Sequence, residues 1–351
     1  MLNVLSKRPL IISGPCSAET EEQLISTAVR LAQTGRVNVI RAGIWKPRTH
    51  PGGFEGVGVS GLSWLLKAKK LTALPTTVEV ATAKHVEYSL QFEVDMLWVG
   101  ARTTVNPFSM QEVAQALHGV QTPVFVKNPV NPDLELWAGA VERIACCGAK
   151  VMGLVLRGFS TFASGEYRNQ PMWHLAIEMK RRFPELIMIC DPSHICGQRE
   201  SLQKVIQHSI DLGFDGIMIE SHIDPKNAWS DANQQITPAL LEQMLNQIIW
   251  RKESTPEQAF NIALEKFREQ ITQLDDYIIS LLGQRMSIAE KIGQFKRDNQ
   301  ITILQANRWN EIIARAKKHG EMVGLSTEFI SRYMDAVHIE SIHHQNQIMN
   351  E

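Results

Sequence analysis

Charged and metal-ligating side chains recur through the first 250 residues, each close after a short apolar run. One set is cationic and comprises Arg41, Lys46, Arg48, Arg102, Lys127 and Arg157. A second set has the chemistry of metal ligands and comprises Cys16, His194, Glu220 and Asp231. Any single member could instead be a solvated loop residue or a satisfied core histidine. Together the cations predict a bound polyanion, because Arg and Lys are the usual partners of phosphate and carboxylate. The ligand set suits Mn, Fe, Co or Zn.

Eight apolar, β-rich runs precede these side chains and predict eight strands. They span residues 9–15, 38–43, 76–80, 95–101, 123–128, 151–158, 186–191 and 216–221. A helix-like segment follows each run, so the pattern predicts an α/β fold, a TIM (β/α)8 barrel of about 250 residues. The carboxyl ends of the strands would then bring both sets of side chains to one mouth. An open doubly wound sheet is the alternative, but it would carry fewer strands and a glycine-rich first turn.

The composition is typical of an ordinary globular protein with two domains. The chain has 351 residues, of which 44% are hydrophobic and 21% are charged, and this length exceeds what one core usually organises. A net charge of −1 gives no general attraction to nucleic acid or membrane, so neither is an expected partner. The first residues contain no leader or membrane-spanning stretch, which favours a cytoplasmic location. Five cysteines without framework spacing are expected to be mostly buried thiols.

The strand pattern stops at Arg251, and only helices are predicted beyond it. We therefore predict a barrel domain at 1–250, a linker at 251–259 and an all-α helical domain at 260–351. Thr255 is the predicted N-cap of the first helix. Apolar residues then follow at alternating spacings of four and three, from Phe260 to Phe295. A helix of some forty residues is about 60 Å long, so a second copy of the chain is expected to cover this apolar seam.

Arg285 interrupts the seam at a position where an apolar residue is expected. A cation in a buried seam is costly without an anion. Lys296 lies within about 20° of the same helix face, so the two side chains could converge on one ligand. Arg308 lies on the second predicted helix, and Ser341 and Gln345 lie four apart on the last. The alternative is that Arg285 is a polar residue that sets the register of a coiled coil.

A series of motifs resembles that of 3-deoxy-D-arabino-heptulosonate 7-phosphate (DAHP) synthases of the type I-beta branch. The motifs are GPCSAE, KPRT, GAR, LRG, DPSH, IESH and AWSD, in this order over nearly all of residues 9–250. The resemblance implies condensation of phosphoenolpyruvate with erythrose 4-phosphate to DAHP and phosphate. It also implies one divalent metal ion per barrel, with Mn favoured over Fe, Co and Zn. The implied metal ligands are Cys16, His194, Glu220 and Asp231.

The same resemblance distributes the cations between the two substrates. Phosphoenolpyruvate is assigned to Lys46, Arg102, Lys127 and Arg157, and the ring of strand-end cations includes Arg41. Arg48 and Thr49 would hold the phosphate of erythrose 4-phosphate, while Lys46, His194 and Glu220 are candidates for proton transfer. The 3-deoxy-octulosonate 8-phosphate synthases resemble this barrel and are the alternative. Their typical Asn-containing motif is replaced here by KPRT, which favours the four-carbon aldehyde.

The C-terminal region resembles the all-helical AroQ-type chorismate mutases, over roughly residues 260–349. The segment FREQITQLDDYIISLLGQRMSIAEKIGQFK is similar to the first helix of that family. The resemblance implies rearrangement of chorismate to prephenate by a homodimer, with Arg268 reaching across from the partner chain. The residues implied to line the site are Arg285, Lys296, Arg308, Ser341 and Gln345. Because the reaction is pericyclic, the site needs only to hold two carboxylates and place Lys296 and Gln345 at the ether oxygen.

Gln305 and Trp309 stand where the mutase family generally has acidic residues that contact the substrate hydroxyl. The alternative is therefore a DAHP synthase whose helical domain only dimerises or senses a ligand. The fusion of a first enzyme of aromatic biosynthesis, the shikimate pathway, to a branch-point enzyme suggests allosteric feedback. We hypothesise that chorismate or prephenate bound by the helices inhibits the barrel.

Overall fold

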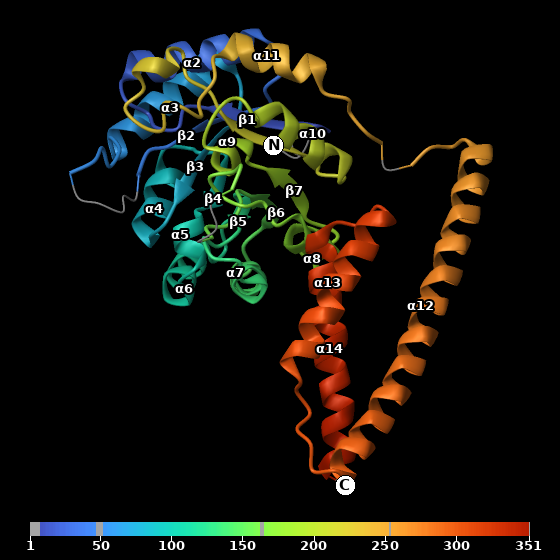
Figure 1. The fold of residues 1–351 in the computed structure, drawn as a ribbon. Helices are drawn as coiled ribbons and strands as arrows, with labels where there is room; N and C mark the ends of the chain where they lie inside the picture. The colour runs from blue at the N-terminus through green and yellow to red at the C-terminus, as the bar shows by residue number, and fades with distance from the viewer. Residues whose placement is uncertain (1–7, 47–51, 162–164, 253, 351) are drawn as a thin grey trace. The chain divides into compact units, whose positions relative to one another are not determined.

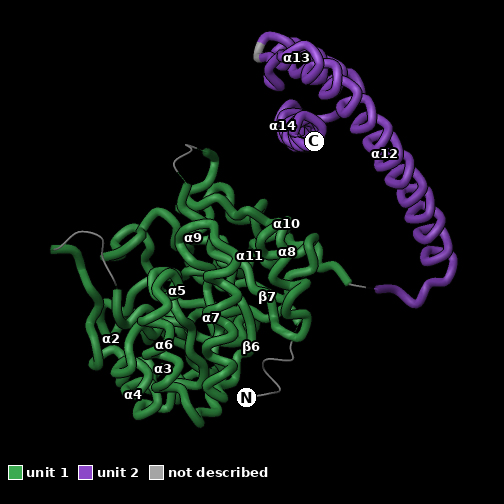
Figure 2. The backbone as a smooth tube through the Cα atoms, turned by 90° about the horizontal axis from the view of Figure 1, so that it is seen from below, with its two compact units in different colours: residues 1–253 green, residues 254–351 purple. Residues whose placement is uncertain are grey.

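The computed structural model describes residues 8–46, 52–161, 165–252 and 254–350. The chain divides into two compact units, residues 1–253 and 254–351 (Figure 2). The predicted boundaries of the domains and of the linker at 251–259 stay a prediction.

The first unit is a closed barrel of eight parallel strands, each pairing with the next in the chain (Figure 1). The strands are β1 (Leu10–Gly14), β2 (Val39–Ala42), β3 (Thr76–Val80), β4 (Met96–Val99), β5 (Val124–Lys127), β6 (Val151–Leu156), β7 (Ile187–Cys190) and β8 (Gly216–Glu220). Pairing of β1 with β8 closes the barrel and sets Gly14 opposite Glu220. The predicted TIM barrel is confirmed, and every predicted strand is present. These strands are buried on both faces, which explains their continuous apolar runs.

Helices surround the barrel, and several begin at a side chain that caps them. They are α2 (Glu21–Gln33), α3 (Val59–Thr72), α4 (Ala83–Gln91), α5 (Ala101–Thr104), α6 (Pro107–Ala116), α7 (Leu134–Cys146), α8 (Trp173–Arg182), α9 (Pro192–Cys196), α10 (Leu202–Asp211), the 3₁₀ helix η1 (Pro225–Asn227) and α11 (Pro238–Gln247). Thr20, Thr82 and Asp191 each accept a backbone hydrogen bond at a helix start.

The apolar core of this unit has two parts. One lies between the sheet and the surrounding helices. The other fills the inside of the barrel and includes Leu10, Trp98, Phe125 and Met218. Because the inside is packed, the polar strand ends are confined to the mouth of the barrel rather than lining a pore.

The second unit consists of α12 (Gln258–Asp298), α13 (Ala306–Met322) and α14 (Thr327–Asn350). Helix α12 packs against α14, where Gly293 permits close approach: a Cβ at this position would lie 3.1 Å from Cα of Gln345. The predicted N-cap at Thr255 is wrong, because α12 begins at Gln258. The Thr255 hydroxyl instead accepts a 3.3 Å bond from the backbone of Glu257, in a turn that precedes the helix.

Much of the predicted seam of α12 is exposed in the single chain. The exposed apolar side chains include Phe260, Phe267, Ile271, Leu274, Ile278, Leu281, Ile288, Ile292 and Phe295. Over the described ranges, no helix is both long and apolar enough to cross a membrane.

Candidate active sites

The four predicted metal ligands lie at the mouth of the barrel in two close pairs. Sγ of Cys16, just after β1, lies 3.2 Å from Oδ2 of Asp231. Nε2 of His194, in α9, lies 3.8 Å from Oε1 of Glu220, the last residue of β8. Within the described residues, no three His, Cys, Asp or Glu side chains already stand at metal-ligand spacing around one point. The structure therefore brings the donors together pairwise.

Cations lie against these donors. Nζ of Lys46 donates to Sγ of Cys16 at 2.9 Å and to its backbone oxygen at 3.2 Å. Nη2 of Arg41 donates to Oε1 of Glu220 at 3.2 Å. Arg41 is only 2% exposed, yet its Nε and Nη1 have no hydrogen-bond partner in the described part of the chain. Two buried guanidinium donors without a partner are costly unless an anion accepts from them.

The other predicted cations that the structure describes lie around the same mouth of the barrel. Nζ of Lys127 is 2.7 Å from Oδ2 of Asp191, and the Trp98 ring lies under both Lys127 and Arg41, at 5.6 and 5.1 Å. Arg157 donates to Oδ1 of Asn169 at 2.8 Å.

Arg102 is exposed and lies in α5, directly after β4. Burial is the main cause that lowers the pKa of Arg157 to about 10, and the charge of Arg102 adds to this effect. Arg48 and Thr49 lie outside the described residues.

The protonation states of three predicted metal ligands suit metal binding. Burial opposes the charge on Glu220, but His194, Arg41 and Lys46 lower its pKa. Burial likewise opposes the charge on Asp231, and Lys46 is the main cause that lowers its pKa. Burial lowers the pKa of His194 despite Asp191 and Glu220. Carboxylates and a neutral imidazole are the forms that bind metals.

Cys16 and Lys46 do not have protonation states that suit metal binding. Burial raises the pKa of the Cys16 thiol to about 12, and Glu220 adds to this effect. Burial opposes the charge on Lys46, but Cys16 and Glu220 raise its pKa. Cys16 must therefore lose a proton to bind a metal as thiolate. One thiol, one imidazole and two carboxylates are donor types that suit a borderline divalent ion, and their side chains lie in two close pairs.

The helical unit brings together four of its predicted site residues. Arg285 on α12 donates to the hydroxyl of buried Ser341 on α14. Nε2 of Gln345 donates to the backbone oxygen of Ser341 at 3.2 Å, and its Oε1 is buried without a partner in the described residues. Lys296 donates to the backbone oxygen of Ile303, and burial lowers its pKa. Burial is the main cause that lowers the pKa of His338 on α14, and Arg285 and Lys296 add to it, so both cations lie within electrostatic range of this histidine.

Two other predicted residues of the helical site are not brought to this cluster. Arg308 is exposed and pairs with Glu311 at 2.8 Å. Arg268 is exposed and pairs with Glu265 at 2.5 Å. Arg268 lies seventeen residues before Arg285 on α12, about 26 Å along the helix axis. Within one chain it is therefore too far away to contact the same small ligand.

The sequence model of the DAHP synthetase I family matches residues 5–256. The chain belongs to the DAHP synthetase I family. The sequence model of chorismate mutase type II matches residues 267–346. Both resemblances seen in the sequence are confirmed, and the chain is a bifunctional enzyme of aromatic biosynthesis with a DAHP synthase domain and a chorismate mutase domain.

Relatives and solved structures agree with this membership. A phospho-2-dehydro-3-deoxyheptonate aldolase of Thermotoga maritima is 30% identical over 238 residues, 68% of each chain. A crystal structure of a phospho-2-dehydro-3-deoxyheptonate aldolase from Thermotoga maritima has a TM-score of 0.61 at 29% identity, and the match covers 68% of this chain and 67% of that one. A 2-dehydro-3-deoxyphosphooctonate aldolase of Trichlorobacter lovleyi is 26% identical over 263 residues, 68% of this chain and 90% of its own.

Sequence reasoning missed several residues that contact the predicted metal ligands of the DAHP synthase barrel. Asp191 accepts from Nδ1 of His194 at 3.0 Å, which leaves Nε2 facing Glu220. Nε2 of Gln234 donates to Oε2 of Glu220 at 2.7 Å, and Arg168 donates to Oδ1 of Asp231 at 3.0 Å. Asp191 stood in a motif, DPSH, but nothing in the sequence tells which side chain it orients.

A buried pair of side chains, Glu19 and His222, also links three segments that carry predicted metal ligands. Glu19 and His222 are 5% and 3% exposed, and Oε2 of Glu19 lies 3.3 Å from Nε2 of His222. Oε1 of Glu19 accepts from the backbone of Trp229 at 2.7 Å. These residues follow Cys16, follow Glu220 and precede Asp231 by two or three positions. The pair therefore fixes the segments that carry three of the predicted metal ligands.

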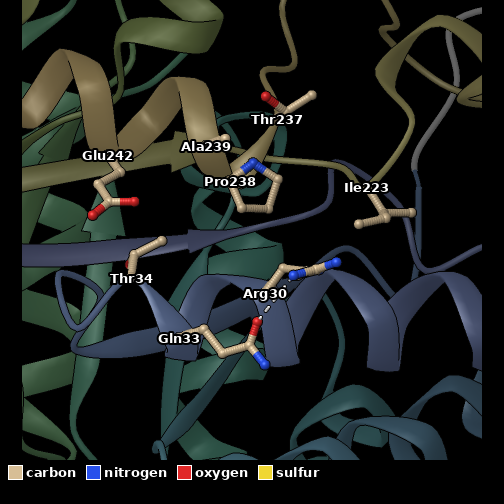
Figure 3. Close-up of a pocket in the computed structure, with 8 residues that line it drawn as sticks. All are labelled: Arg30, Gln33, Thr34, Ile223, Thr237, Pro238, Ala239 and Glu242. Carbon is tan, nitrogen blue, oxygen red and sulfur yellow. Dashed lines mark hydrogen bonds between the residues drawn. The ribbon is translucent and has the colours of Figure 1, made fainter.

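A separate pocket of about 290 Å³ lies between α2 and α11 (Figure 3). Arg30, Gln33 and Glu242 are among its polar residues, and Arg30 donates to Gln33 at 3.3 Å. It contains none of the predicted site residues, so it is not part of the DAHP synthase centre.

Proposed function

We propose that the barrel condenses phosphoenolpyruvate with erythrose 4-phosphate at one divalent metal ion, releasing phosphate. Arg41 carries this proposal: it is buried beside Glu220 with two N–H groups that have no partner among the described residues. Such donors suit a small, highly charged anion at the barrel mouth. In this proposal Lys127, Arg157, Arg102 and Lys46 bind phosphoenolpyruvate, and Arg48 with Thr49 binds the aldehyde phosphate.

Cys16, His194, Glu220 and Asp231 would hold the metal ion, with Mn favoured over Fe, Co and Zn. When bound, a divalent ion supplies Lewis-acid polarisation of a carbonyl oxygen. The side chains of the protein have two further roles. The cations neutralise phosphate and carboxylate charge, and Asp191 orients His194. Lys46 lies against Cys16 and is charged, so it is placed to give a proton near the ligands.

Phosphate release tests the choice of aldehyde. The purified protein would be given phosphoenolpyruvate, Mn²⁺ and either erythrose 4-phosphate or arabinose 5-phosphate. We expect the four-carbon aldehyde to be strongly preferred, because KPRT stands at 46–49. A strong preference for arabinose 5-phosphate would indicate a 3-deoxy-octulosonate 8-phosphate synthase and would contradict the proposal.

We propose that the helical domain rearranges chorismate to prephenate as a homodimer. The short contact between Arg285 and Ser341, with Gln345 and Lys296 nearby, supports a dianion site. The exposed apolar face of α12 supports a second copy as its cover, and that copy would supply Arg268. Conversion of chorismate followed by ultraviolet absorbance tests the activity, and Arg285→Ala should abolish it. A protein that binds chorismate without converting it would instead be a sensor.

Feedback between the two activities is proposed as well. Prephenate or chorismate bound at Arg285 would inhibit phosphate release by the barrel. In the intact protein, prephenate should inhibit the wild type, while Arg285→Ala should keep its basal phosphate release and lose the inhibition. Equal inhibition of both proteins, or none in the wild type, would refute this regulation.

A further inference from the structure

Helix α14 presents two buried polar atoms that have no hydrogen-bond partner among the described residues. They are Nε2 of His338 and Oε1 of Gln345. Seven residues separate them, which is close to two helical turns, so both lie on one face about 10 Å apart. A buried polar atom without a partner is costly, so the pair indicates a polar ligand on this face.

The residues around His338 indicate which chemical group of a ligand its imidazole could bind. The indole ring of Trp309 stacks on the imidazole, with ring centroids 3.9 Å apart and planes at 12°. Burial, Arg285 and Lys296 lower the pKa of His338, while Asp335 opposes them. At neutral pH a neutral imidazole therefore stands beside two cations, with its ring plane fixed by Trp309.

We propose that His338 is a specificity-determining residue that binds the neutral hydroxyl group of a cyclic dicarboxylate in the helical site. This inference rests on the proposed chorismate site. Arg285 and Lys296 match the carboxylates by charge, and a neutral imidazole matches a neutral hydroxyl because each can either donate or accept. Trp309 orients the imidazole and covers it with apolar surface.

Steady-state kinetics on two substrates tests the assignment. The substrates are chorismate and an analogue without its ring hydroxyl, and both kcat and KM are measured on the full chain. His338→Leu should raise KM for chorismate about tenfold with little change in kcat, and leave KM for the analogue unchanged. His338→Gln keeps an N–H close to the position of Nε2 and should restore most of the affinity. The control is His343→Leu, an exposed histidine on the same helix, which should behave as the wild type.

The possible outcomes separate this inference from the proposed site. If His338→Leu raises KM for both substrates by the same factor, His338 has only a structural role. If it changes neither, His338 does not contact the ligand. Either result overturns the inference while leaving the mutase site in place. If the wild type neither binds nor converts chorismate, the proposed site and this inference fail together.

Discussion

Side chains that touch no substrate hold much of the barrel site in place. Glu19 bonds to His222 and to the backbone of Trp229, and so ties together three segments that carry proposed metal ligands. The Nδ1 atom of His222 accepts from the backbone of Asp224 at 2.9 Å, which leaves Nε2–H to face Glu19. Residues that orient metal ligands in this way commonly contribute ten- to hundredfold, in order of magnitude, to metal affinity.

Glu19→Gln should therefore weaken Mn²⁺ binding roughly tenfold. The amide would turn an N–H toward the N–H of His222 and lose that bond, while its oxygen still accepts from Trp229. Calorimetric titration of the metal-free protein with Mn²⁺ measures the effect. Glu22→Gln is the matched control, because Glu22 is an exposed carboxylate three residues further on, in the first turn of α2. Equal weakening in both variants would contradict a specific role for Glu19.

Lys296 predicts how the mutase responds to pH. Burial lowers its pKa below the ordinary 10.5, so it loses its proton sooner than an exposed lysine as the pH rises. Since the proposed role needs the ammonium form, kcat/KM for chorismate should fall on the alkaline side, at a pH below 10.5. Lys296→Met should be nearly inactive at every pH. A profile that stays flat beyond the ordinary lysine pKa would argue against this role.

The strands and helices can be predicted from the sequence more completely than the contacts between side chains. Each strand of the barrel is a short apolar run because both of its faces are buried, and this pattern is visible without a structure. The sequence predicts the start of α12 wrongly, because Thr255 can cap a helix or close a turn and only the backbone distinguishes the two. Asp191 and Glu19 could not be assigned roles, because their partners depend on how loops from different strands meet.

The exposed apolar face of α12 allows the proposed dimer interface to be tested. Ile271→Glu places a charge within the exposed face that a second copy is proposed to cover, and should give a monomer by light scattering. Chorismate conversion should fall at least about tenfold, because a lost charge-assisted contact from Arg268 is worth roughly 1.5–3 kcal/mol. Phosphate release should be unchanged. Gln273→Glu, an exposed position outside the apolar spacing, is the control. A dimeric Ile271→Glu protein would show that α12 is not the interface.

At the scale of the molecule, the two activities have different chemical needs. All proposed metal ligands lie in residues 1–253, and the proposed mutase residues lie in 254–351. Removal of the metal by a chelator should reduce phosphate release by roughly a hundredfold or more and leave chorismate conversion intact. Added Mn²⁺ should restore phosphate release. Loss of both activities on chelation would mean that the metal also supports the helical unit.

The closure of the barrel by β1 and β8 has a consequence for how this enzyme matures. Gly14 pairs with Glu220, so Cys16, near the beginning of the barrel, meets the other proposed metal ligands only when the last strand docks. Contacts between such distant parts of a chain form late and slowly in folding. A nascent chain that has not yet emerged beyond β8 can hold neither Glu220 nor Asp231 beside Cys16. Metal uptake would therefore mark the completion of the barrel during synthesis, and not an early step that guides it.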